Sequence, residues 1–87
     1  MARRIWVERL LISPATATKI RGIHSLEPDE VRDAVERVEG LRGKWDINPQ
    51  RGSRALLHIH IGGERRLVVL YPLATPDVYA LGSAYTH

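Results

Sequence analysis

The 87-residue sequence contains no cysteine, so disulfide bonds and thiolate metal sites are excluded and the compartment stays undefined by redox chemistry. Long apolar runs are also missing. Glu8 and Arg9 interrupt the apolar residues near the start, which predicts neither a signal peptide nor a membrane span. We find no phosphate-cradling glycine loop, nucleophile elbow, dinucleotide fingerprint, repeat or low-complexity tract.

The composition predicts one small domain covering residues 1–87, because 44% of the residues are hydrophobic and can form a modest core. The net charge of +3 is mild, but its distribution is uneven. Seven of the ten acidic residues lie in 27–46, whereas 1–24 and 51–66 are basic. If both basic segments fold onto one side, they form a surface that binds a polyanion.

The pattern of apolar residues and of proline and glycine predicts strands at 4–12, 54–61, 64–71 and 78–85, helices at 14–21 and 28–39, and a loop at 41–53. Gly22 is expected to end the first helix in a left-handed conformation, and Gly40 the second. Trp45, within the loop, is expected to close the edge of the core. The order β-α-α-β-β-β predicts a two-layer α+β domain, with both helices on one face of a mostly antiparallel sheet.

Gly62-Gly63 predicts a two-residue hairpin turn, since glycine supplies the positive φ angles such a turn needs. The turn places His60 opposite Arg65, His58 opposite Leu67, and Arg54 opposite Tyr71. One face then carries the core residues Ala55, Leu57, Ile59, Ile61, Val68 and Leu70. The other face carries Arg54, Leu56, His58, His60, Arg65, Leu67, Val69 and Tyr71.

This second face mixes imidazole, guanidinium and aromatic groups, which suits RNA because bases stack and phosphates form ion pairs there. An ordinary exposed sheet face, or the interface of a homodimer, would explain the same residues. The junction before the second helix adds Lys19, Arg21 and His24, a group of cations and a titratable ring suited to a phosphate-bearing ligand.

Cleavage of RNA without a metal needs a base for the 2′-hydroxyl, cations for the phosphate and an acid for the leaving oxygen. The candidate catalytic residues are His24, His58, Arg54, Arg65, Tyr85 and His87. The candidate RNA-binding residues are Lys19, Arg21, Arg51, His60 and Tyr71. Each of these side chains also has a simpler explanation as a solvated surface or capping group.

A metal site is not predicted. His58-Ile-His60 supplies two imidazoles, which leaves a zinc site at least one ligand short. The carboxylates at 29–36 are explained by solvation of a helix and by its dipole. We therefore expect no metal and no cofactor.

The chain resembles the RelE/ParE superfamily of small toxins, and within it the BrnT-like group. The resemblance rests on Lys19 to Val31, with a basic residue, His24, Leu26, a proline-led helix start and Asp29-Glu30-Val31, and extends loosely to Leu81-Gly82-Ser83-Ala84. Two positions differ from the BrnT-like pattern: Ile23 stands where a lysine is common, and Tyr85 where an arginine is common.

The resemblance implies a cytoplasmic toxin of a type II toxin-antitoxin pair, a metal-independent endoribonuclease that acts on mRNA, free or ribosome-bound, and is restrained by a cognate antitoxin. In that scheme His58 or His24 is the base, Tyr85 or His87 the proton donor, and Arg54, Arg65 and Lys19 contact phosphate. Two alternatives stay open: a non-catalytic nucleic-acid-binding or interaction module of the same fold, and an inhibitor of DNA gyrase.

Overall fold

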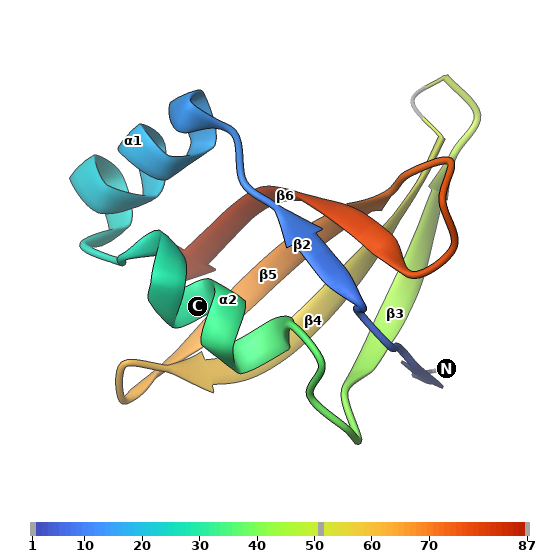
Figure 1. The fold of residues 1–87 in the computed structure, drawn as a ribbon, viewed down its shortest axis with the longest axis horizontal. Helices are drawn as coiled ribbons and strands as arrows, with labels where there is room; N and C mark the ends of the chain where they lie inside the picture. Colours follow the sequence, from blue (N-terminus) through green and yellow to red (C-terminus); the bar gives the residue numbers. More distant parts are fainter. Residues whose placement is uncertain (1, 51, 87) are drawn as a thin grey trace.

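The computed structural model describes residues 2–50 and 52–86, and it confirms the α+β class with both helices on one side of a mostly antiparallel sheet (Figure 1). Within these described residues, two helices and six strands follow in the order β1 (Arg3–Arg4), β2 (Arg9–Leu11), α1 (Pro14–His24), α2 (Pro28–Val35), β3 (Arg42–Asn48), β4 (Gly52–Ile61), β5 (Glu64–Pro72) and β6 (Val78–Thr86). The spatial strand order is β1-β3-β4-β5-β6-β2, and β2 pairs with β6 in parallel.

The N-terminal segment joins the two edges of the curled sheet. Its β1 residues pair with β3 at one edge, and its β2 residues pair with β6 at the other. Between them Ile5 and Val7 point into the core, with 5% and 0% of their surface exposed. The predicted continuous strand at 4–12 is therefore wrong, because the chain must cross from one edge to the other and pairs only at its two ends.

Residues 42–48 form a strand, so the predicted loop at 41–53 is wrong. Gly43 suits the strand because the Cδ1 atom of Ile5 lies 2.3 Å from the position that a Cβ would take. Trp45, two residues further along β3 and therefore on the same face, packs against the core as expected and lies near the Tyr79 ring, with 6.4 Å between centroids. The missed signal is the alternation of small or apolar residues at 43, 45 and 47 with polar ones between them.

Both helices begin where the sequence predicts, but neither ends there. The hydroxyl of Ser13 accepts a hydrogen bond from Thr16 N, and a capping box joins Glu27 and Glu30. Helix α1 continues through Gly22, which is therefore an interior residue, and ends at Ser25 with a φ of 49°. Helix α2 ends at Val35, four residues early.

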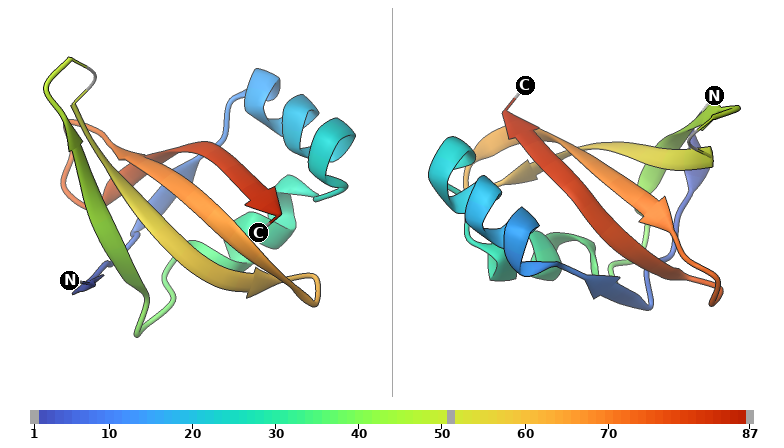
Figure 2. Two further views of the ribbon diagram at one scale, coloured as in Figure 1. Left: turned by 180° about the vertical axis from the view of Figure 1, so that it is seen from behind. Right: turned by 90° about the horizontal axis from the view of Figure 1, so that it is seen from above.

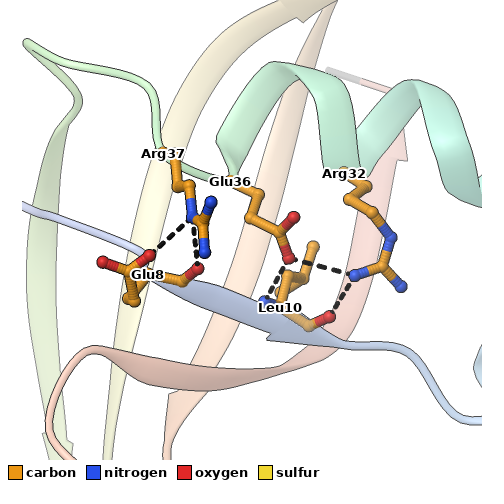
Figure 3. A network of polar contacts seen from close by, with 5 residues as sticks. All are labelled: Glu8, Leu10, Arg32, Glu36 and Arg37. Carbon is orange, nitrogen blue, oxygen red and sulfur yellow. Dashed lines mark hydrogen bonds and ion pairs between the residues drawn. The ribbon is translucent and has the colours of Figure 1, made fainter.

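The early end of α2 has a cause in the N-terminal segment. Arg37 adopts a φ of 56° and its backbone N–H donates to Val7 O at 2.7 Å, which draws the chain out of the helix. Nearby, the side chains of Arg32 and Glu36 reach Leu10 of β2, and Arg37 forms an ion pair with Glu8 (Figure 3). Tertiary contacts with the N-terminal segment, from Val7 to Leu10, thus override the helical pattern of residues 36–39.

The hairpin is confirmed. Gly62 and Gly63 have φ angles of 63° and 80°, and the register pairs His60 with Arg65 and His58 with Leu67. The predicted core face is buried except for Ile59, which is half-buried. One core-face residue was missed by the sequence analysis: Arg66, opposite Ile59, is only 5% exposed.

No helix in residues 2–50 or 52–86 has the length and apolarity needed to cross a membrane.

Candidate functional site

The sheet face opposite the helices is uncovered, as the view from behind shows (Figure 2, left). Residues paired across antiparallel strands share a face, so the register defines the members of this open face. From these pairs we define the open face as the following residues of the four long strands: Arg42, Lys44, Asp46 and Asn48 of β3, Arg54, Leu56, His58 and His60 of β4, Arg65, Leu67, Val69 and Tyr71 of β5, and Ser83 and Tyr85 of β6. The predicted face of β4 and β5 thus exists, and it gains one column of residues from β3 and another from β6.

The open face carries a cation excess. Among its members are four arginine and lysine side chains, two histidines and a single carboxylate, that of Asp46. Lys44 and Arg42 are exposed, and the sequence pattern did not predict them on this face because the glycines and the proline of their segment indicated a loop. An anionic ligand that lies along β3 and β4 therefore meets more positive charge than the sequence pattern predicts.

Three of the predicted site residues come together where α1 meets the end of β6. The ring of His24 meets the ring of Tyr85 edge-on, with 5.6 Å between centroids, and the Lys19 Nζ atom lies 5.8 Å from the centre of the same tyrosine ring. Tyr85 is 43% exposed and His24 is half-buried, so a ligand can reach both. We call Lys19, His24 and Tyr85 the α1–β6 cluster.

His58 lies in the same row of the sheet as the cluster. The register pairs His58 with Leu67 and Leu67 with Tyr85, so His58 and Tyr85 are two strands apart on the open face. Strands are spaced by about 4.8 Å, which places their backbones roughly 10 Å apart. Leu67 lies between these two residues in the row.

The other end of the open face holds a second, separate group. The Arg54 Nε atom donates to Asp46 Oδ2 at 2.7 Å. The pKa of Arg54 is raised, first by this bond and second by a bond to Tyr71. Asn48, Gly52, Arg54 and Tyr71 line a small pocket of about 70 Å³. Arg54 is four residues from His58 along β4, about 13 Å, so it does not join the cluster.

Tyr71 is fixed on this face by a glycine. Its Cε2 atom lies 2.4 Å from the position that a Cβ of Gly82 would take, at a register shift between β5 and β6. Any larger residue at position 82 would displace the ring. Val69 is buried beside it, at 3% exposure, so this part of the face is more apolar than predicted.

The remaining predicted residues lie elsewhere. Arg21 forms an ion pair with Glu27, with 3.0 Å between Nε and Oε2. His60 and Arg65 are exposed and face each other at the hairpin end of the open face. Arg51 and His87 lie outside the described residues, so their predicted roles have no structural counterpart. In the part of the chain that the structure describes, no three histidine or acidic side chains gather as a metal site.

No protein-family model, no curated protein and no solved structure matches the chain.

Proposed function

We propose that the chain is the toxin of a type II toxin-antitoxin pair, a metal-independent endoribonuclease that cleaves mRNA in the cytoplasm. The observation that carries the proposal is the α1–β6 cluster at one end of an uncovered, cation-rich sheet face. The toxin assignment itself rests on the sequence resemblance around Lys19 to Val31, which includes two of the three cluster residues.

Single-stranded RNA would lie across β3 to β6, with its phosphates near Lys44 and Arg65 and its bases stacked on exposed rings. At the scissile phosphate, the 2′-oxygen attacks phosphorus as its proton passes to His58. The bond from phosphorus to the 5′-oxygen breaks, and the leaving oxygen takes a proton from Tyr85 or from protonated His24. The products are a 2′,3′-cyclic phosphate and a 5′-hydroxyl, so atoms and charge balance without a metal.

The Lys19 ammonium is suited to the charge that develops on the phosphate oxygens, because it lies close to the proposed proton donor. Arg54 is assigned to substrate binding instead, since it is held by Asp46 at the far end of the face. This division of roles differs from the sequence expectation, which placed Arg54 among the catalytic residues.

The test is to incubate the purified protein with single-stranded RNA in excess EDTA and to look for cyclic-phosphate ends. We expect cleavage, and we expect Tyr85→Phe and His24→Ala each to lower the rate by about 10²-fold or more. Tyr79→Phe is the matched control. It removes a hydroxyl from the same strand, at a buried ring, and should leave the rate unchanged.

Other outcomes discriminate among the alternatives. Salt-sensitive binding without cleavage supports a non-catalytic nucleic-acid-binding module, and altered DNA supercoiling with no effect on RNA supports a gyrase inhibitor. Cleavage that EDTA abolishes contradicts the proposed chemistry. The toxin assignment further requires a small protein encoded beside this chain that binds it and stops the cleavage.

A further inference from the structure

Arg66 is an unusual residue of the core face. It lies on β5 opposite Ile59, with Val68 and Leu70 following on the same face, and it is only 5% exposed. Its neighbour Arg65 points to the other face and is exposed. Burying a guanidinium carries a large desolvation cost, so the contacts that it makes there must be considered.

The contacts of Arg66 join the two elements that carry the α1–β6 cluster. Its Nη1 atom donates to His24 O and to Thr86 Oγ1, each at 3.1 Å. Its Nη2 atom lies 3.5 Å from the exposed Glu64 carboxylate. His24 O belongs to the last turn of α1, where carbonyls have no partner within the helix and favour a cation. Thr86 directly follows Tyr85 on β6.

We propose that Arg66 is the positioning residue of the candidate site, which holds the His24 and Tyr85 rings in contact by tying their backbones together. The inference rests on the proposed function for its catalytic meaning. Its geometric part states that the buried Arg66 guanidinium holds the rings of His24 and Tyr85 together. This part depends only on the two hydrogen bonds, to His24 O and Thr86 Oγ1.

Stability alone does not explain this residue. The Nε atom of Arg66 is buried and has no hydrogen-bond partner among the described residues. A buried ion pair can often be replaced by apolar side chains of similar volume without loss of stability, whereas removal of one partner is costly when it leaves the other charge buried. The Glu64 partner of Arg66 is exposed, so replacing Arg66 leaves no buried charge behind. A planar guanidinium offers instead a fixed pair of donor directions, which lysine and methionine lack. Two acceptors on different elements are joined here by one nitrogen of that group.

The first experiment compares Arg66→Met and Arg66→Lys with the wild type, and uses Arg9→Met as the matched control. Arg9 is exposed on β2 and pairs with Val78, which is seven residues from Tyr85 along β6. We expect Arg66→Met to fold and to lose the NMR cross-peaks between the His24 and Tyr85 rings. We expect its kcat for RNA cleavage in EDTA to fall by about 10²-fold with little change in KM, because bound RNA is held elsewhere on the face. Arg66→Lys should restore only part of either signal.

A second variant keeps the proposal testable if Arg66→Met fails to fold. Thr86→Val removes one acceptor at an exposed position and leaves the core intact, and we expect weakened cross-peaks and a smaller fall in kcat. If the wild-type protein cleaves no RNA, the proposed function fails, while the cross-peaks still decide the role of Arg66. Wild-type cross-peaks in folded Arg66→Met, or in Thr86→Val where the first variant is unfolded, overturn the inference.

Discussion

The Glu36 carboxylate accepts a hydrogen bond from the backbone N–H of Leu10, with 2.9 Å between the two atoms. Arg32 donates to the carbonyl of the same residue and pairs with Glu36 at 3.1 Å (Figure 3). Two side chains of the α2 region thus satisfy both backbone groups of Leu10 on the outer edge of β2. An edge strand covered in this way cannot readily pair with a second chain.

Glu36→Gln should destabilise the fold by about 1 kcal/mol at neutral pH, because the charge-assisted bonds to Leu10 and Arg32 are weakened. The pKa of Glu36 is lowered from its ordinary value of 4.5, chiefly by the Leu10 N–H and then by Arg32, while partial burial opposes the change. Because the pKa of Glu36 is lower in the folded protein than in the unfolded chain, its charge contributes fully to the free energy of unfolding above pH 4.5. This contribution disappears as the pH falls through the pKa of Glu36 in the folded protein.

Urea unfolding of the two proteins at neutral pH and in acid below pH 4.5 measures this effect. The difference between wild type and Glu36→Gln should shrink in acid, and the exposed control Glu39→Gln should show no such dependence. A constant difference across pH would mean that the Glu36 charge contributes nothing to stability.

Gly22→Ala should stabilise the protein by about 0.5–1 kcal/mol, because glycine is a poor residue for a helix interior and, beyond the neighbouring residues and the backbone of the helix itself, no atom lies within 4 Å of the new Cβ. Destabilisation instead would indicate the left-handed helix end that the sequence suggested.

Gly43→Ala is the contrasting substitution. Its Cβ would meet the buried Cδ1 of Ile5, so we expect a loss of about 1–3 kcal/mol in the same unfolding assay.

The glycines of this chain show which structural features a local sequence pattern predicts and which it does not. The hairpin register was predicted correctly because the Gly62-Gly63 turn and the alternation beside it are both local signals. The role of Gly43 depends on Ile5, which is distant in sequence and is brought there by pairing of β1 with β3. The end of α2 likewise depends on Val7, to which Arg37 donates.

The candidate site also combines features that local sequence signals predict with features that depend on residues distant in sequence. Alternation placed His58, Arg65 and Tyr71 on one face correctly. The contact of His24 with Tyr85 joins residues 61 positions apart, and no spacing in the sequence specifies it. The position of Arg66 on the core face could have been predicted, because side chains alternate between the two faces along a strand. Its hydrogen bond to His24 O could not, because it requires the packing of α1 along β6.

Lys44→Ala should weaken RNA binding and lower the slope of log K against log salt by about 0.7, the value for loss of one phosphate contact on a single strand. Lys44 is exposed on β3 and shares the open face with Leu56, its partner in the register. Fluorescence anisotropy with a labelled oligonucleotide at several salt concentrations gives both quantities. Arg37→Ala should change neither, because Arg37 follows α2 on the helix side of the sheet and pairs with Glu8. An unchanged slope in Lys44→Ala would remove β3 from the RNA path.

Asp46→Asn should have the opposite effect and tighten RNA binding. Asp46 is the single carboxylate among the open-face residues, and it holds the Arg54 guanidinium at 2.7 Å. Neutralising it removes repulsion of the phosphates and releases Arg54 to pair with one of them, which should raise the salt slope by about 0.7. The control is Asp33→Asn on the exposed face of α2, where the same change of charge lies away from the sheet face. If both substitutions tighten binding equally, net charge and not the open face governs the affinity, and the RNA path proposed across β3 and β4 is wrong.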